Sequence, residues 1–426
     1  MHVRLVGGAE QEDPDELRLL AESAGARVVG MVAGRRDKPD AATYIGSGKA
    51  DEVRAAVETE CAELVLVNHP LSPSQERNLE KIIGCRVLDR VGLILDIFAQ
   101  RARSAEGKLQ VELAQLEHLS TRLVRGWTHL ERQKGGIGLR GPGETQLEVD
   151  RRLIRDRIKK LNQRIERVSV QRRARRKARL KIPVPTVSLV GYTNAGKSTL
   201  FNRLTQSSVY TADQLFATLD PTMRRVELAG NTAVILADTV GFIRHLPHKL
   251  VEAFKSTLEE VVEASLLLHV VDANHGDRRE QMEQVNKVLE EIEAAGIPQV
   301  IVFNKTDLTG ETTHVERDDS GQVARVWLSA QTGAGVDLLL EVLAERYRQQ
   351  THALCLQLPP QAGRLRAALY EEFDVRTETV LETGDWRIDV TLNEKQLAWL
   401  WRHPDFREEY VERKSRARLA RAGARA

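Results

Sequence analysis

A glycine-rich loop directly after an apolar stretch is the feature that most limits how this chain can fold. The apolar run at 187–190 leads into Gly191-Tyr-Thr-Asn-Ala-Gly-Lys-Ser198. The two glycines let the backbone turn so that N–H groups point at phosphate oxygens, and a helix starting near Lys197 adds its positive dipole end. Lys197 is expected to reach the β- and γ-phosphates, and the Ser198 hydroxyl to hold Mg²⁺. The order predicted is therefore a strand, a triphosphate-binding loop and a helix.

A second motif, Asp238-Thr-Val-Gly241, follows the apolar run at 233–237. At a strand end, the Asp238 carboxylate would lie in the water shell of the metal and the Gly241 N–H beside the γ-phosphate. The alternative for the first loop, a surface glycine turn, does not explain this second motif at the expected distance. The two motifs together predict a nucleoside triphosphate site.

A third motif, Asn304-Lys-Thr-Asp307, follows the apolar run at 300–303 and predicts a clamp for a purine base. The Asp307 carboxylate can accept hydrogen bonds from both the ring N–H and the exocyclic amine of guanine, whereas adenine offers neither group there. Ser329 and Ala330, after another apolar run, would close the pocket with backbone N–H groups. The ligand predicted is GTP or GDP.

The segment Phe216-Ala-Thr-Leu-Asp-Pro-Thr222 lies between the first two motifs. A mobile loop there could bring a threonine hydroxyl to Mg²⁺ only when a γ-phosphate is present. Thr218 is the expected metal ligand, and Thr222 is the alternative. A loop threonine without any ligand is the simpler interpretation of either residue.

Phe242 stands where many GTPases carry a glutamine that orients the attacking water. Phenylalanine has no group for that purpose, so unassisted hydrolysis is expected to be slow. A partner, a group supplied in trans or a monovalent cation would have to position the water. Asn194 could help to bind K⁺ beside the phosphates, and the alternative is an asparagine that satisfies its own loop backbone.

The motifs define the expected site residues. The residues expected to act in catalysis are Lys197, Thr218 and Gly241, and those expected to hold Mg²⁺ are Ser198, Thr218 and Asp238. The residues expected to bind the nucleotide lie in loops after apolar runs: Gly191, Tyr192, Thr193, Asn194, Ala195, Gly196, Lys197, Ser198, Thr199, Phe216, Ala217, Thr218, Leu219, Asp220, Asp238, Thr239, Val240, Gly241, Asn304, Lys305, Thr306, Asp307, Ser329 and Ala330.

Alternating apolar runs and helical stretches predict an α/β fold with a doubly wound sheet of the P-loop GTPase kind. A small α/β domain is expected before it, followed by a long antiparallel helical hairpin, and a small α+β domain after it. The predicted boundaries are 1–98 for the N-terminal domain, 99–182 for the hairpin, 183–350 for the GTPase domain, 351–412 for the C-terminal domain and 413–426 for a basic tail.

The hairpin is predicted from two apolar seams at helical spacing. Leu109, Leu113, Leu116, Leu119 and Leu123 form the first, and Leu147, Ile154, Ile158, Leu161, Ile165 and Val168 form the second. The connection at 134–144 contains five glycines and a proline. Such a loop gives either flexible slack or close backbone approach to another surface.

Charge is concentrated in the second helix of this hairpin. Residues 151–181 hold fifteen Lys and Arg against two acids, although the whole chain carries a net charge of only +2. An acidic body with one basic arm suits a specific nucleic-acid partner, while a solvated helix face is the simpler alternative. The residues expected to bind RNA are Lys134, Arg140, Arg172, Arg173, Arg175 and Arg176.

The remaining features of the sequence say less about function. Tyr44-Ile-Gly-Ser-Gly-Lys49 resembles a truncated phosphate loop and is interpreted as a turn and helix start that could bind an anion. Three scattered cysteines fit a reducing cytosol without a zinc site. No signal peptide and no apolar run of membrane-spanning length is present, so a cytoplasmic protein without membrane insertion is expected.

The glycine loop between two long helices, the order of the nucleotide motifs and Phe242 together resemble the HflX family of ribosome-associated GTPases. The likeness covers nearly all of the chain up to about 412. It implies a GTP hydrolase that binds the large ribosomal subunit and its RNA, with the hairpin loop near the peptidyl-transferase region. It also implies splitting or rescue of stalled ribosomes under stress such as heat, and use of ATP through the N-terminal region.

Two other classes of function stay open at this point. One is a GTP-controlled adaptor whose basic helix binds an acidic protein or, peripherally, an anionic membrane surface. The other is an RNA-remodelling ATPase that uses the N-terminal domain. Binding that is lost after ribonuclease treatment would favour the ribosome over the adaptor.

Overall fold

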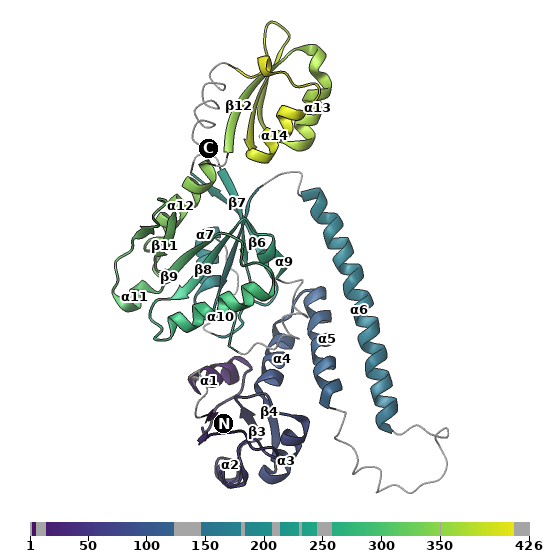
Figure 1. The fold of residues 1–426 in the computed structure, drawn as a ribbon, viewed down its shortest axis with the longest axis vertical. Helices are drawn as coiled ribbons and strands as arrows, with labels where there is room; N and C mark the ends of the chain where they lie inside the picture. The colour runs from purple at the N-terminus through teal and green to yellow at the C-terminus, as the bar shows by residue number, and fades with distance from the viewer. Residues whose placement is uncertain are drawn as a thin grey trace.

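The fold was obtained as a computed structural model that describes residues 2–5, 14–122, 146–179, 184–206, 214–229, 232–244, 258–349 and 351–412. Figure 1 shows an N-terminal part, a central sheet with its helices and a C-terminal part in succession, with two long helices at the side. Among the described residues, no helix combines the length and the hydropathy that a membrane-spanning segment needs.

The central sheet has seven strands in the order β10-β11-β9-β8-β5-β7-β6. Its strands are β5 (Thr186–Gly191), β6 (Thr222–Leu228), β7 (Thr232–Asp238), β8 (Leu266–Asp272), β9 (Gln299–Asn304), β10 (Val315–Arg317) and β11 (Val323–Trp327). The five inner strands are parallel, and the edge strands β6 and β10 are antiparallel to their neighbours. The predicted doubly wound sheet is confirmed. The two antiparallel edge strands were not part of the prediction.

Helices cover both faces of this sheet. They are α7 (Lys197–Thr205), α9 (Glu259–Val262), α10 (Arg278–Glu291), α11 (Thr306–Thr309) and α12 (Val336–Gln349). Side chains of α7 and α12 share one buried cluster with Leu189, while those of α9 and α10 share another with the next residue, Val190. This alternation along β5 is the period-two pattern of a strand that is buried on both faces. The sequence pattern also predicts a helix at 249–263, of which only the end lies within the described residues.

The N-terminal part contains two separate parallel strand pairs. Strand β1 (His2–Leu5) pairs with β2 (Ala33–Arg36), and β3 (Leu64–Val67) pairs with β4 (Arg86–Asp89). The helices are α1 (Pro14–Ser23), α2 (Ser47–Glu60), α3 (Pro73–Ile83) and α4 (Arg90–Arg101). The sequence pattern predicts a strand at the apolar pair Val28 and Val29, but this pair lies outside any strand and is 37% and 40% exposed. Strand β2 begins only at Ala33, where it pairs with β1.

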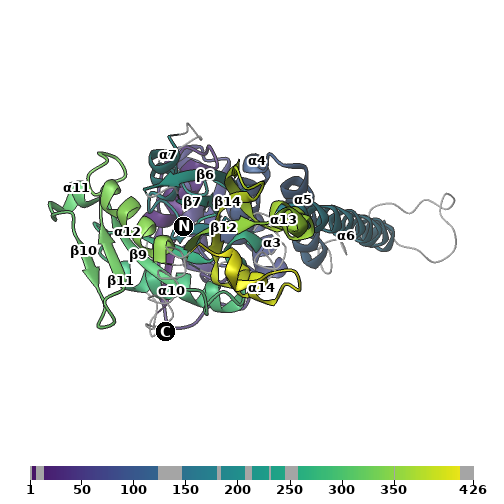
Figure 2. The ribbon, with the colours of Figure 1, turned by 90° about the horizontal axis from the view of Figure 1, so that it is seen from above.

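The predicted helical hairpin is present as α5 (Ala105–Arg122) and α6 (Gln146–Arg179), which lie side by side in Figures 1 and 2. Leu161 of α6 is 1% exposed, whereas Leu153, outside the predicted seam, is 59% exposed. An ion pair between Arg157 and Glu112 also joins the two helices. In Figure 2, α6 extends away from the central sheet towards the edge of the molecule.

The C-terminal part has a three-stranded antiparallel sheet in the order β12-β14-β13. It consists of β12 (Thr351–Leu358), α13 (Gly363–Glu372), β13 (Asp374–Val380), β14 (Trp386–Asn393) and α14 (Glu394–Arg402). The two strands and the helix predicted from alternation are present, and β13 and α14 complete a small α+β unit around its own buried cluster.

Candidate nucleotide site

The phosphate loop connects the carboxyl end of β5 to the first turn of α7. Gly196 has φ +92°, and a Cβ there would lie 2.2 Å from Nδ2 of Asn304. Glycine is required at this position both for the backbone conformation and for the space. Asn304 ends strand β9 and begins the third sequence motif. The first and third motifs are therefore in contact at Gly196.

Lys197 is 6% exposed, and its ammonium group is held inside the loop that it ends. Its Nζ donates to the carbonyl oxygens of Gly191 at 3.0 Å and Tyr192 at 2.7 Å. Burial lowers the pKa of Lys197 to about 8, against the opposing attraction of Asp238. A buried cation with a lowered pKa is a group that gains from anionic phosphates.

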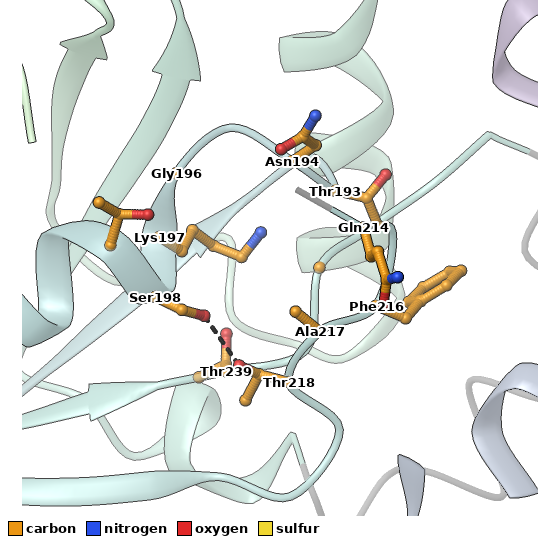
Figure 3. A pocket seen from close by; sticks show the side chains of 12 residues that line it. Thr193, Asn194, Gly196, Lys197, Ser198, Gln214, Phe216, Ala217, Thr218 and Thr239 are labelled. Atoms are coloured by element: carbon orange, nitrogen blue, oxygen red, sulfur yellow. Dashed lines mark hydrogen bonds between the residues drawn. The ribbon is translucent and has the colours of Figure 1, made fainter. Parts of the chain in front are cut away.

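Three oxygen-bearing side chains converge beside the loop, as Figure 3 shows for Ser198 and Thr218. The Ser198 hydroxyl lies 2.8 Å from that of Thr218 and donates to Oδ2 of Asp238 at 2.7 Å. Thr218 donates to the same carboxylate oxygen at 2.9 Å. Thr222, the alternative ligand, instead lies in β6 at the register position opposite Asp238.

The chemistry of this cluster fits Mg²⁺. Burial raises the pKa of Asp238, and its Oδ1 atom is buried with no hydrogen-bond partner among the described residues. A hard divalent cation prefers hydroxyl and carboxylate oxygens and water, and it would offset the cost of burying this carboxylate.

The peptide after Gly241 is fixed to the phosphate loop by two backbone hydrogen bonds. The N–H of Phe242 donates to the Gly191 carbonyl at 3.1 Å, and the N–H of Thr193 donates to the Phe242 carbonyl at 2.7 Å. A Cβ on Gly241 would lie 2.9 Å from the Lys197 ammonium and from two Thr193 atoms. Glycine at 241 therefore keeps space beside the lysine, where a γ-phosphate is expected.

The Phe242 side chain lies in a buried cluster. It is 2% exposed and belongs to the same cluster as Phe98 of α4 and Leu20 of α1. The position therefore differs from that of a water-orienting glutamine in burial as well as in chemistry.

The residues expected to clamp the base lie at the ends of β9 and β11. The Asn304 amide donates to the Ala195 carbonyl at 2.9 Å and accepts from the Ala330 N–H at 2.8 Å. Lys305 forms a 2.7 Å ion pair with Asp272, and Asp307 is exposed at the start of α11. Asn304 thus ties the base-side loops to the phosphate loop.

A pocket at the phosphate loop brings together most of the expected phosphate-side residues. Its lining is Thr193, Asn194, Gly196, Lys197, Ser198, Thr199, Gln214, Phe216, Ala217, Thr218, Thr239 and Gly241. Gln214 was missed by the sequence analysis, since it precedes the recognised segment and belongs to no motif. Asn194 has φ +61° and no side-chain hydrogen bond to another described residue.

The side chains of two residues expected at the nucleotide contact other parts of the chain, the N-terminal part and the start of the hairpin. The Tyr192 hydroxyl donates to the Glu16 carboxylate and accepts from the Arg244 N–H at 2.9 Å. Glu16 also pairs with Arg90, which is 2% exposed, at 2.6 Å. Asp220, the other residue, accepts backbone hydrogen bonds from Ser104 and its neighbour.

The expected RNA-binding residues cannot be placed by their side chains. Lys134 and Arg140 lie outside the described residues. Arg172, Arg173, Arg175 and Arg176 belong to the last turns of α6, beyond the helix residues whose side chains are described.

The segment at 44–49 is the start of helix α2, as expected. Lys49 donates to the Ala33 carbonyl at 3.0 Å and pairs with Glu52 at 2.7 Å. Its ammonium group therefore already has two oxygen partners inside the N-terminal part.

We expect proton uptake when GTP binds in alkaline solution. With a pKa of about 8, Lys197 is largely neutral at pH 9 before binding, and neighbouring phosphates favour its charged form. Affinity should consequently fall as the pH rises above about 8. Calorimetry in two buffers with different ionisation enthalpies should detect about one proton taken up at pH 9 and about 0.1 at pH 7. An equal proton count at both pH values would contradict the lowered pKa.

A doubly wound sheet with a phosphate loop, a hydroxyl and carboxylate cluster and a guanine clamp at its strand ends defines a P-loop GTPase. Family models describe the same division: GTP-binding GTPase N-terminal at 11–99, GTP-binding GTPase Middle Region at 101–179 and 50S ribosome-binding GTPase at 186–305.

Curated relatives identify the family. The chain is 56% identical to the GTPase HflX of Escherichia coli (strain K12) over 92% of both chains. It is 46% identical to the GTPase HflX of Caldanaerobacter subterraneus over 90% of this chain and 88% of that one. The chain belongs to the HflX family of GTPases and is a GTP hydrolase.

Solved structures include a more distant likeness. A GTP-binding protein from the archaeon Sulfolobus solfataricus in complex with GDP is 24% identical, with a TM-score of 0.43 over 82% of this chain and 99% of that one.

Proposed function

We propose that this GTPase binds the large ribosomal subunit through its helical hairpin. GTP binding and hydrolysis would then drive the splitting or rescue of stalled ribosomes under stress such as heat shock. The name of the matched family model, 50S ribosome-binding GTPase, supports the choice of partner. The observation that carries the proposal is the basic outer surface of α6, on a helix whose apolar side packs against α5.

The basic surface is built on the side of α6 that its seam leaves outside. Ile154, Ile158, Ile165 and Val168 are half-buried around the fully buried Leu161. Basic side chains predominate among the exposed residues of this stretch, which also exposes the acids Asp156 and Glu166: Arg152, Arg155, Lys159, Lys160, Arg164 and Arg167. A predominantly basic surface on a projecting helix suits the phosphates of RNA better than an apolar protein surface does.

The nucleotide site supports a partner that stimulates hydrolysis. Phe242 is buried, and the residues expected to act in catalysis, Lys197, Thr218 and Gly241, line the pocket without a carboxylate or side-chain amide that could orient the attacking water. A group or loop rearrangement supplied on docking would complete the site.

The chain's own residues account for the remaining chemistry. Lys197 and the loop N–H groups would hold the β- and γ-phosphates, and Ser198 and Thr218 would bind Mg²⁺ with Asp238 at its water shell. The ion would neutralise charge on the transferred phosphoryl group. A K⁺ ion beside Asn194 is a further candidate cofactor.

GTP hydrolysis with and without purified large ribosomal subunits tests the proposal. We expect strong stimulation that weakens as salt increases, because phosphate contacts release counterions. The variant R155E/R164E on α6 should lower the slope of log binding constant against log salt by about two. The matched control, R279E/R407E, changes two exposed arginines away from the hairpin and should behave like the unaltered protein.

Three outcomes separate the alternatives. Subunits that neither bind nor change the rate would remove the ribosome proposal. Binding to cellular material that survives ribonuclease would favour a protein or membrane adaptor. Equal rates in potassium and sodium salts would remove the K⁺ hypothesis.

A further inference from the structure

On one side, the loop at 214–220 contacts Ser198 and Asp238, which are expected to bind Mg²⁺ together with Thr218. On the other side, it contacts the base of the hairpin. Thr218 faces Ser198 and Asp238. Two residues later, Oδ2 of Asp220 accepts the backbone N–H groups of Arg103 at 2.7 Å and Ser104 at 2.8 Å. The metal ligand and the hairpin anchor are thus separated by a single residue.

Asp220 is part of the N-terminal cap of helix α5. The Ser104 hydroxyl donates to Asp220 Oδ1 and accepts the Gly107 N–H at 2.9 Å, which makes Ser104 a capping residue. A Cβ at Gly107 would lie 2.5 Å from the same Asp220 oxygen, so glycine leaves room for the carboxylate. A negative charge at this end of α5 also interacts favourably with the helix dipole.

Neighbouring residues fix the rest of the loop to the N-terminal part. The Leu215 N–H donates to the Ser23 hydroxyl at 2.9 Å, and Arg101 donates to the Gln214 side chain. The Phe216 ring packs edge-on against Phe98 of α4 at 4.7 Å between centroids. Because these contacts hold the loop in place, a movement of Thr218 towards or away from the expected Mg²⁺ position would also move the loop relative to α4 and α5.

We propose that Asp220 is a positioning residue that couples the metal ligand Thr218 to the start of hairpin helix α5. Occupation of the γ-phosphate position and the orientation of the hairpin then bias one another. The coupling is reciprocal, so anything that holds the hairpin changes the preference for GTP over GDP. This inference concerns the nucleotide and the hairpin alone and stands without the ribosome.

Nucleotide affinities of Asp220→Ala and Ser104→Ala test the coupling. In Mg²⁺, we expect Asp220→Ala to bind a non-hydrolysable GTP analogue about 5- to 100-fold more weakly. GDP affinity should stay within about twofold, since Thr218 is expected to bind the metal only when a γ-phosphate is present. A residue that merely stabilises the fold would weaken both nucleotides or neither.

The hydroxyl of Ser104 supplies matched controls. Ser104→Thr retains the capping oxygen and should resemble the unaltered protein, while Ser104→Ala should show part of the Asp220→Ala effect. The double variant should lose no more affinity than Asp220→Ala, because both substitutions break the same contact between Ser104 and Asp220. Equal weakening of GDP and the GTP analogue, or fully additive losses, would overturn the proposal. Circular dichroism verifies that each variant folds. If Asp220→Ala does not fold, the comparison of Ser104→Ala with Ser104→Thr still tests the proposal.

A distance measurement tests the hairpin directly. Spin labels at exposed Leu153 on α6 and exposed Glu283 on α10 would be compared in GDP and in the GTP analogue, with the native cysteines replaced. The nucleotide-dependent change in distance should be present in the parent and reduced in Asp220→Ala. An identical change in both proteins would show that another contact carries the coupling.

Discussion

Replacement of Asp307 by asparagine is expected to change the preferred substrate from GTP to XTP. Asp307 is the second residue of helix α11, shortly after the end of β9, and it is exposed, so a base can reach it. Guanine presents two donors to a carboxylate, the ring N–H and the exocyclic amine. Xanthine has a carbonyl oxygen in place of the amine, so the asparagine amide could accept from the ring N–H and donate to that oxygen. A buried polar group left unpaired can cost about 10⁴-fold in specificity.

Specificity constants for GTP, XTP and ATP measure this change. The Asp307→Asn protein should lose GTP hydrolysis by about 10³- to 10⁴-fold and gain XTP hydrolysis. Asp319→Asn, another exposed aspartate in the same domain, is the control and should retain GTP preference. If the variant keeps its preference for GTP, the base clamp is wrong. ATP hydrolysis unaffected by the substitution would indicate a second site in the N-terminal part.

The nucleotide site could be predicted from sequence because each motif is short and follows its own strand. Parallel strands bring their carboxyl ends to one edge of a sheet, so Lys197, Asp238 and Asn304 meet once the alternation of strand and helix is recognised. Thr218, chosen over Thr222 as the expected metal ligand, lies beside Ser198 and Asp238. Local pattern and a known topology were sufficient for these residues.

Contacts between distant parts of the chain could not be predicted in this way. Asp220 lies in the same segment as Thr218, which suggested a nucleotide role, yet its partners are about 116 residues away in the sequence. Tyr192 is similar, since its partner Glu16 belongs to α1. Neither pairing has a periodicity or a spacing that a single sequence reveals. The same holds for Gln214, whose place in the pocket follows from the docking of its loop.

Phe242 shows how structure changes the interpretation of a residue that sequence singled out. From the sequence, phenylalanine at 242 indicated that no group there could orient water. In the structure its ring is buried with residues of α1 and α4, and its backbone is fixed to Gly191 and Thr193. The side chain therefore acts in the packing between the nucleotide domain and the N-terminal part.

Substitution of glutamine at Phe242 is consequently expected to destabilise the protein without accelerating hydrolysis. Loss of a buried phenylalanine costs about 3–5 kcal/mol, and an amide without partners in an apolar cluster costs about 1–3 kcal/mol more. Thermal unfolding should detect a markedly lower midpoint. Single-turnover GTP hydrolysis, measured well below that midpoint, should be no faster than in the unaltered protein.

Phe242→Leu separates the loss of packing from the introduction of a polar group. Leucine keeps an apolar side chain in the cluster and should lower stability by about 1–2 kcal/mol, with the hydrolysis rate unchanged. A glutamine variant that is stable and hydrolyses GTP faster would mean that this side chain can turn to the γ-phosphate. The buried orientation would then be only one of two states, and phenylalanine would restrain the rate by its chemistry alone. Slow hydrolysis together with lost stability would instead show that the domain contact has taken the position a catalytic side chain would need.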